Sequence, residues 1–134
     1  MKSSPLILGL ALVFLAGCTT TKPVSKDSFA PETVMVTYHV KAGSEVQFEQ
    51  LLRNLWQIYT ENHMVRAKPH LILQDAEKGG VRVTEIFTWV SHDMPEQAPE
   101  SVHTLWQQMH SFCESRDGHP ALDGGEVQIV PTGK

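Results

Sequence analysis

The sequence predicts an α+β domain in which two helices cover one face of a four-stranded antiparallel sheet. Short segments rich in β-branched and aromatic residues alternate with two longer segments whose apolar residues recur every three or four positions. Their order along the chain is strand, helix, strand, strand, helix, strand. With 134 residues, 41% of them hydrophobic, the chain has the size and composition of one globular domain.

The first strand and the first helix are predicted to follow one another directly. Residues 34–40 (VMVTYHV) are typical of a strand, and residues 42–43 indicate a turn. Ser44 and Gln47 have the spacing of a capping box, so a helix is expected to start there and to end near 62–63. The apolar stripe of this helix consists of Phe48, Leu51, Leu52, Leu55 and Tyr59.

The middle of the chain is predicted to form a hairpin. Residues 69–75 (PHLILQD) and 81–90 (VRVTEIFTWV) have the composition of strands, and the Lys-Gly-Gly at 78–80 is a turn signal between them. A second helix is predicted over 100–113 and a short last strand over 126–130. The resulting β-α-β-β-α-β order is the split pattern of ferredoxin-like folds.

Residues 1–17 have the features of a signal peptide for export. Lys2 supplies a positive charge, and the apolar run 5–16 is shorter than the roughly 20 residues of a spanning helix. The run ends in LAGC at 15–18, which resembles the lipobox of bacterial lipoprotein precursors. We therefore expect cleavage before Cys18 and lipid attachment to its thiol. An ordinary secretory signal in which Cys18 is incidental is the alternative.

A lipid on Cys18 would hold the protein to a bilayer. Thr19 follows the cysteine, and by resemblance to the sorting rule of Gram-negative lipoproteins this favours the outer membrane, facing the periplasm. Residues 18–32 are rich in Thr, Ser, Lys and Pro and are expected to form a lipidated flexible tether. Residues 33–134 are then the folded domain.

Charge and cysteine content restrict the function classes. The formal net charge is −4 and there is no basic cluster, which argues against nucleic acid as a partner. If Cys18 is lipidated, Cys113 has no intramolecular disulfide partner. Cys113 falls on the apolar stripe of the second helix and is expected to be a small buried hydrophobe.

Alternation along the third predicted strand places Glu85 on the same face as Val83, Phe87 and Trp89. A carboxylate among large apolar side chains would be desolvated and could serve as a base. The plainer interpretation is an exposed or salt-bridged glutamate at a strand position. Trp89 is a candidate for stacking against a ligand, and an ordinary core position is its alternative.

A small, mostly apolar pocket is expected between the sheet and the helices. We expect Tyr38, Glu85, Trp89, His103 and Trp106 to line it, with Glu85 and His103 as candidates for a base. A solvated position on the flank of its helix is the alternative for His103. The seven histidines lack the spacing of a metal site, and no nucleotide- or cofactor-binding motif is present, so neither a metal nor a cofactor is expected.

The stretches VTYHVKAGSEVQFEQLL (36–52) and VTEIFTWVS (83–91), with the helix around His103, resemble the antibiotic biosynthesis monooxygenase-like (ABM-like) family of dimeric α+β barrels. The resemblance covers about residues 34–130. It implies a fold shared by cofactor-independent oxygenases of polycyclic phenols, haem-degrading enzymes and many proteins of unknown activity. Trp89 and His103 could match two residues of the haem-degrading set, but the first strand lacks its asparagine, which argues against haem degradation.

Two functions are compatible with these features. The favoured expectation is a non-catalytic lipoprotein of the cell envelope that binds a small apolar or aromatic ligand, because a shared fold does not imply shared chemistry. The alternative is a cofactor-independent monooxygenase that acts on a small aromatic substrate, with Glu85 or His103 as its base. The sequence does not decide whether the protein is an enzyme.

A homodimer is expected because the helices can cover only one face of the sheet. Regular alternation without a bulge predicts that Leu71 and Leu73 share the helix-covered face with Val36, Tyr38, Val83 and Phe87. The open face would carry Met35, Ile72, Ile86 and Val90. A second copy laid over such a patch would bury it and close a two-chain barrel.

Overall fold

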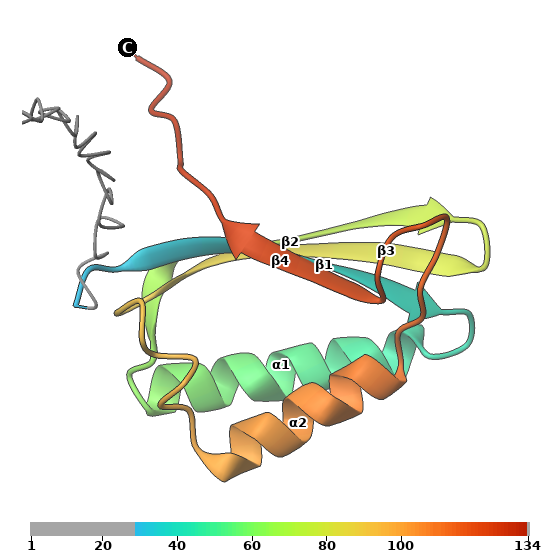
Figure 1. Cartoon of the computed structure of the whole chain (residues 1–134), viewed down its shortest axis with the longest axis horizontal. Helices are drawn as coiled ribbons and strands as arrows, with labels where there is room; N and C mark the ends of the chain where they lie inside the picture. The colour runs from blue at the N-terminus through green and yellow to red at the C-terminus, as the bar shows by residue number, and fades with distance from the viewer. Residues whose placement is uncertain (1–28, 134) are drawn as a thin grey trace, which may run out of the picture.

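The computed structural model describes residues 29–133 (Figure 1), so the predicted signal peptide, Cys18 and most of the predicted tether lie outside the described residues. The predicted order of elements is confirmed. The elements are β1 (Glu32–Lys41), α1 (Glu45–Glu61), β2 (Val65–Glu77), β3 (Gly80–Trp89), α2 (Glu100–Ser111) and β4 (Leu122–Glu126).

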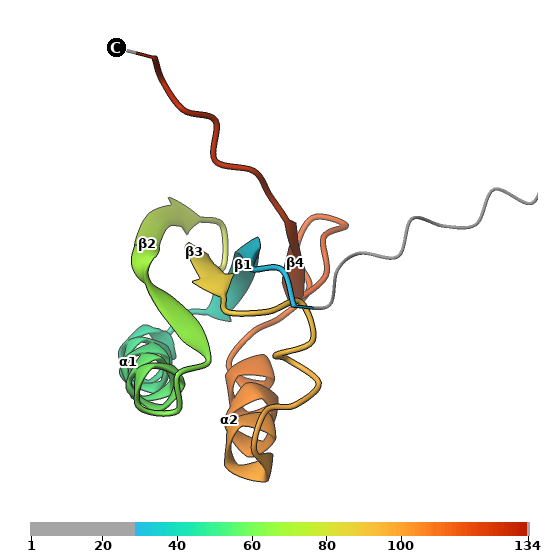
Figure 2. The ribbon, with the colours of Figure 1, turned by 90° about the vertical axis from the view of Figure 1, so that its left-hand side faces the viewer.

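The four strands form one antiparallel sheet in the order β2-β3-β1-β4. Both helices lie on the same side of this sheet, as Figures 1 and 2 show from two directions, and the opposite side is open. This is the ferredoxin-like α+β arrangement that the sequence predicts. None of the helices within residues 29–133 is long and apolar enough to cross a membrane.

The core lies between the sheet and the two helices. The predicted stripe of α1 is buried over its whole length, and Val102 and Met109 are the buried residues of α2. From the sheet, Tyr38, Val40, Val83 and Phe87 pack against them. Each large side chain buried in this way contributes about 1.5–3 kcal/mol, so this layer of side chains holds the helices against the sheet.

The first turn of α1 differs from the predicted capping box. Ser44 is the residue before the helix, as predicted, but its hydroxyl makes no hydrogen bond to the helix amides. Gly43 precedes it with a φ of +86°, a conformation that glycine adopts without strain. The start of α1 is therefore set by this turn and by the packing of its apolar stripe.

The predicted last strand is wrong in position. Strand β4 spans Leu122–Glu126, and Val36 of β1 lies opposite its Gly124. Residues 128–133, which include most of the predicted segment 126–130, extend beyond the sheet. Composition misplaced the strand because LDGGE has weak strand propensity, whereas VQIV at 127–130 has strong propensity. Pairing with β1 decides where β4 forms.

The predicted faces of β2 are also wrong. Leu71 lies opposite Ile86 and Leu73 opposite Thr84, which places both leucines on the open face, while His70 and Ile72 are on the helix side. The register of the strand shifts between Val65 and His70. His70 stacks on Trp56 of α1, so a polar ring lies on the helix side of β2. The assignment from hydrophobicity alone put the two leucines on that side and was therefore wrong.

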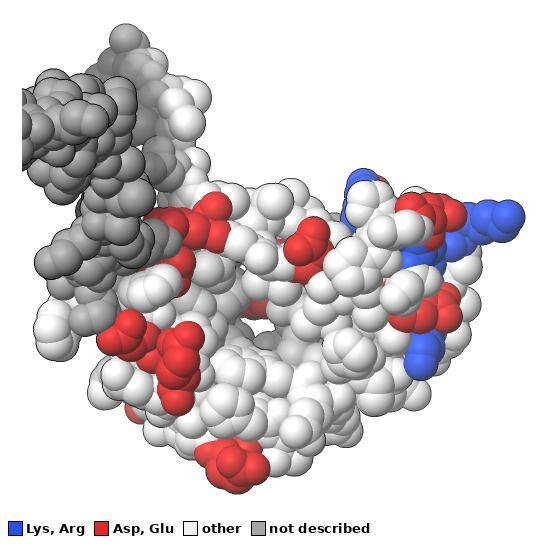
Figure 3. Space-filling model, in the orientation of Figure 1, with Lys and Arg blue, Asp and Glu red and all other residues white. Residues whose placement is uncertain are grey.

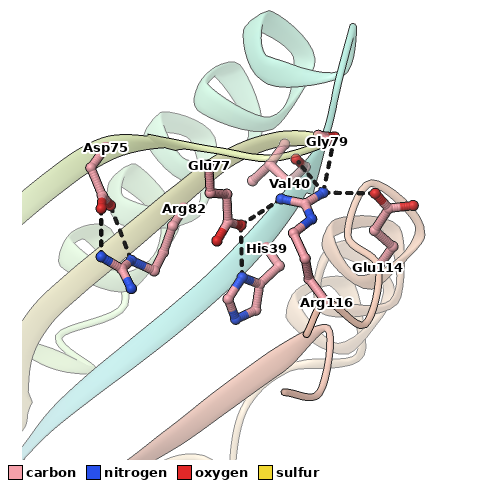
Figure 4. A network of polar contacts seen from close by, with 8 residues as sticks. All are labelled: His39, Val40, Asp75, Glu77, Gly79, Arg82, Glu114 and Arg116. Carbon is pink, nitrogen blue, oxygen red and sulfur yellow. Dashed lines mark hydrogen bonds and ion pairs between the residues drawn. The ribbon is translucent and has the colours of Figure 1, made fainter. Parts of the chain in front are cut away.

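A polar network on the open side of the sheet joins three segments (Figure 4). Arg116, which follows α2, is buried and bonds to Glu77 of β2, to Glu114 and to the carbonyl oxygens of Val40 and Gly79. The imidazole Nδ1 of His39 lies 2.7 Å from the same Glu77 carboxylate.

Beside this polar network, the backbone of β1 lies very close to the backbone of the β2–β3 turn. A Cβ at Gly80 would lie 2.0 Å from the carbonyl oxygen of Val40, so this position admits only glycine. The network therefore has a structural role: it holds β1, the β2–β3 turn and the segment after α2 together at one end of the sheet.

Candidate functional site

A cavity of about 290 Å³ lies between the sheet and the helices. The space-filling view shows the surface hollowed in this region (Figure 3). The volume is near the lower end of the range for small-molecule sites, which suits a ligand of one or two rings. The cavity is lined by Val36, Tyr38, Tyr59, Phe87, Trp89, Trp106, Met109 and Leu122.

Aromatic rings dominate the walls of this cavity. The Trp89 ring centroid lies 4.8 Å from that of Phe87, 5.1 Å from that of Tyr59 and 6.4 Å from that of Trp106. These rings meet edge to face, so they support one another and present flat surfaces to the cavity. Such walls favour a planar apolar ligand.

The Tyr59 hydroxyl is the polar group best placed to meet a ligand. It accepts a hydrogen bond from the indole Nε1 of Trp106, and its own proton makes no hydrogen bond to another group in residues 29–133. Burial raises the pKa of Tyr59 well above its ordinary value, so the hydroxyl keeps this proton. It can therefore donate to a carbonyl or hydroxyl oxygen of a ligand.

Glu85 lies behind the cavity wall and is only 4% exposed. The Tyr38 hydroxyl donates to its Oε2 over 3.2 Å, and Nε2 of His70 lies 3.1 Å from its Oε1. His70 in turn stacks on Trp56 of α1, with ring centroids 3.4 Å apart. Glu85 is thus held between two fixed partners.

The tyrosine of this cluster keeps its proton. Burial raises the pKa of Tyr38 well above its ordinary value, and the neighbouring Glu85 charge raises it further. The Tyr38 hydroxyl therefore acts as a donor to Glu85 and contributes only its oxygen and ring to the cavity. Tyr38 is the cavity-lining residue through whose hydroxyl Glu85 could receive a ligand proton.

The structure brings three of the five predicted pocket residues together. Tyr38, Trp89 and Trp106 line one cavity. Glu85 is buried behind Tyr38, in contact with polar groups that the sequence did not indicate. His103 lies outside the lining and packs edge-on against Trp106, with ring centroids 5.0 Å apart. The Trp106 ring lines the cavity and His103 does not, so this position does not favour His103 as a base for a ligand there.

Sequence reasoning missed most of the lining and one polar partner. Tyr59 was recognised only as part of the apolar stripe of α1, although its hydroxyl is the free donor in the cavity. His70 carried no signal, because its contact with Glu85 depends on the pairing of β2 with β3. The rest of the lining is apolar, and no sequence signal separates these residues from ordinary core positions: Val36, Phe87, Met109 and Leu122.

Other reactive groups within residues 29–133 lie apart from this cavity. Cys113 is buried as predicted, and burial raises its pKa to about 11, which favours the thiol over the nucleophilic thiolate near neutral pH. Within residues 29–133 no three His, Cys, Asp or Glu side chains are arranged to hold a metal ion. The open face carries a shallow cavity of about 460 Å³ lined by residues that include Thr37, His39 and Arg82.

Solved structures share this fold. A variant of SnoaB, a cofactor-independent oxygenase from Streptomyces nogalater, is 15% identical, with a TM-score of 0.56 over 76% of this chain and 95% of that one. A second, an antibiotic biosynthesis monooxygenase, is 15% identical, with a TM-score of 0.57 over 74% and 98%. A conserved protein from Methanosarcina mazei is 13% identical, with a TM-score of 0.54 over 75% and 96%.

At these identities the similarity shows a common fold, and the expected structural resemblance to ABM-like proteins is confirmed at that level. No protein-family model matches the sequence, and no curated protein matches it significantly.

Proposed function

We propose that this protein binds a small planar apolar ligand that carries a hydrogen-bond acceptor, and that it does so without turning the ligand over. The observation that carries the proposal is the aromatic cavity with the free hydroxyl proton of Tyr59. The aromatic walls would bury the ring of the ligand, and Tyr59 would fix its orientation. Ligand sites of this kind combine mostly apolar walls with a few placed polar groups.

We expect 2-acetonaphthone, a planar ketone, to quench the fluorescence of the cavity tryptophans on titration. Tyr59→Phe should weaken this binding about fivefold, because it removes one hydrogen bond worth roughly 1 kcal/mol. Tyr38→Phe is the comparison variant from the same cavity wall: because the Tyr38 proton is given to Glu85, its loss should weaken binding less than the loss of the Tyr59 hydroxyl does. Equal binding of 2-ethylnaphthalene, which lacks the carbonyl, would contradict the role of Tyr59.

A cofactor-independent monooxygenase is the second candidate. It is favoured by the fold shared with SnoaB and by the Glu85–Tyr38 pair, which could take a proton from a phenol in the cavity. Oxygen uptake with a panel of naphthols separates the two candidates. A stoichiometric loss of oxygen that depends on Glu85 supports the enzyme, whereas ligand-induced stabilisation without oxygen uptake supports the binding protein.

We further propose that the protein is a lipoprotein held to the outer membrane by acyl chains on Cys18. Cys18→Ser should abolish stable membrane attachment of the mature chain, because two or more acyl chains anchor firmly and no other anchor is proposed. Membrane fractionation, with metabolic labelling by a fatty acid, measures this. A Cys18→Ser protein that carries no label and still sediments with the membrane would contradict the lipid anchor.

The open face of the sheet is proposed to be a homodimer interface. Met35, Leu71 and Leu73 are exposed there by 40%, 53% and 58%, and Ile86 lies between Met35 and Leu71 in register. Soluble monomers rarely expose such a patch, and a second copy would cover it. We expect light scattering of residues 18–134 carrying Cys18→Ser to give the mass of a dimer at micromolar concentration. A clean monomer mass would overturn this proposal.

A further inference from the structure

The aromatic cavity has a negative group beside it and no positive group in its wall. Within the described chain, neither Lys nor Arg is among the residues that line it. Glu85 lies one side chain behind the wall, where its Oε2 accepts the hydrogen bond of the lining residue Tyr38. His70 contacts the other carboxylate oxygen, and no Lys or Arg within residues 29–133 is paired with Glu85. A positively charged ligand would therefore meet no like charge in the wall.

The charge of Glu85 is felt inside the cavity. Glu85 is only 4% exposed, so little water screens its charge. Burial is the largest cause of the raised pKa of Tyr38 and of Tyr59, and the charge of Glu85 raises both values further. The two tyrosines belong to β1 and α1, on opposite sides of the cavity, so the negative potential extends across it.

The surroundings of the cavity are acidic as well. Residues 83–133 provide all of α2 and β4 and most of β3, and Arg116 is the only Lys or Arg among them. The guanidinium of Arg116 is held in the polar network on the open side of the sheet (Figure 4). On the face drawn in Figure 3, Asp and Glu side chains lie around the hollow, whereas Lys and Arg gather at one end of the molecule. The field over this face therefore favours the approach of a cation.

The aromatic walls suit a cation as well as an apolar ring. The faces of aromatic rings carry negative potential, and Trp attracts a cation most strongly. The indoles of Trp89 and Trp106 both line the cavity, with centroids 6.4 Å apart and planes inclined by 78°. A charge spread over a flat group is more weakly hydrated than a compact ammonium, as guanidinium shows, so it is the form of cation that such a cavity can desolvate.

We propose that the ligand of this cavity is a planar heteroaromatic cation, of the N-alkylated quinolinium or pyridinium class, that carries a carbonyl acceptor. The inference rests on the proposed binding function and adds the charge of the ligand to it. The ring would lie against the two indoles, and Tyr59 would donate to the carbonyl oxygen. The carboxylate of Glu85 would balance the positive charge through space, with the Tyr38 side chain between them.

Two ligands of the same shape test the charge. 3-Acetyl-1-methylquinolinium is the cation, and 4-methyl-2-acetonaphthone has the same outline and carbonyl without the charge. Isothermal titration calorimetry on residues 18–134 with Cys18→Ser, which contain the whole described fold, measures both dissociation constants. The buffer is at about pH 8, where imidazoles are ordinarily neutral, with about 0.5 M sodium chloride to screen exposed charges. We expect the cation to bind about tenfold more tightly than the neutral ketone.

Three variants separate the buried charge from surface charge, through the ratio of the two affinities. Glu85→Gln keeps the shape of the side chain and should lower the preference for the cation about tenfold. Trp106→Leu replaces an indole by an aliphatic wall and should lower the preference at least twofold, which gives a second test if Glu85→Gln does not fold. Glu49→Gln is the matched control, because it also removes one negative charge, from a half-exposed position on α1, and it should leave the ratio unchanged.

Every other outcome overturns the inference and locates the failure. Equal or weaker binding of the cation, with the ketone still bound, refutes the charge of the ligand and leaves the proposed function of the cavity in place. A preference that survives Glu85→Gln refutes the role of Glu85, and one that falls equally in Glu49→Gln refutes the cavity as its origin. Binding of neither ligand refutes both the inference and the proposed function.

Discussion

Replacing Arg116 with methionine is expected to lower the free energy of unfolding by roughly 3 kcal/mol, as for other broken buried ion pairs. Arg116 is 7% exposed and holds the carboxylates of Glu77 and Glu114 together with two backbone carbonyl oxygens. Methionine fills part of the volume but removes the guanidinium from all four acceptors, and Glu77 then keeps only its contact with His39. Urea unfolding at pH 7 measures the change through the transition midpoint.

The effect of Arg116→Met should depend on pH. Burial raises the pKa of Glu77, but the hydrogen bonds from His39 and Arg116 outweigh it and hold the pKa below its ordinary value. A group whose pKa is lower in the folded state stabilises the protein above its unfolded pKa, near 4.5, and loses that contribution as the pH falls through the folded value. The difference between wild type and variant should therefore be largest near neutral pH and shrink at acidic pH.

Arg82→Met is the matched control for this prediction. Arg82 makes a two-point pair with Asp75 on the same open side of the sheet (Figure 4), but both side chains are about half exposed. Solvent screens such a pair, so its removal should change stability far less than removal of Arg116. Equal losses of unfolding free energy in the two variants would mean that burial does not make the Arg116 network more stabilising than an exposed ion pair.

The helices and the order of elements could be predicted because their signals are local. The stripe from Phe48 to Tyr59 repeats at helical spacing, and burial of one face is what that spacing requires. The strand at 122–126 could not be predicted in the same way. Its LDGGE sequence becomes a strand only because β1 offers a hydrogen-bonding edge, which no local pattern reveals.

The candidate site was predictable where it follows strand alternation. Tyr38 and Trp89 were expected on the helix side, and both line the cavity. The surroundings of Glu85 were not predictable, because His70 reaches it through the register of β2 against β3 and Tyr38 through that of β1 against β3. Long-range pairing therefore gives Glu85 two hydrogen-bonding partners, whereas the sequence left open a desolvated base and an exposed or salt-bridged glutamate.

Glu85→Ala is expected to destabilise the protein by roughly 3 kcal/mol. Loss of the carboxylate leaves the buried Tyr38 hydroxyl without its acceptor, which costs about 1–3 kcal/mol, and the void left by the side chain adds to this. His70 also loses its partner at 3.1 Å. The same urea titration measures the loss, with Glu49→Ala on α1, where the side chain is about half exposed, as a control that should be nearly neutral.

Glu85→Gln separates the structural role of this residue from a chemical one. The amide has nearly the same shape, its oxygen can still accept from Tyr38, and its nitrogen can donate to the other tautomer of His70, so stability should fall by less than about 1 kcal/mol. Because glutamine cannot take a proton, any oxygen uptake with naphthols should disappear in this variant, while binding of 2-acetonaphthone should persist. Oxygen uptake that survives Glu85→Gln in a folded protein would remove Glu85 as a base. A Glu85→Gln protein as unstable as Glu85→Ala would show that the negative charge itself, and not the hydrogen-bond geometry, holds the cluster together.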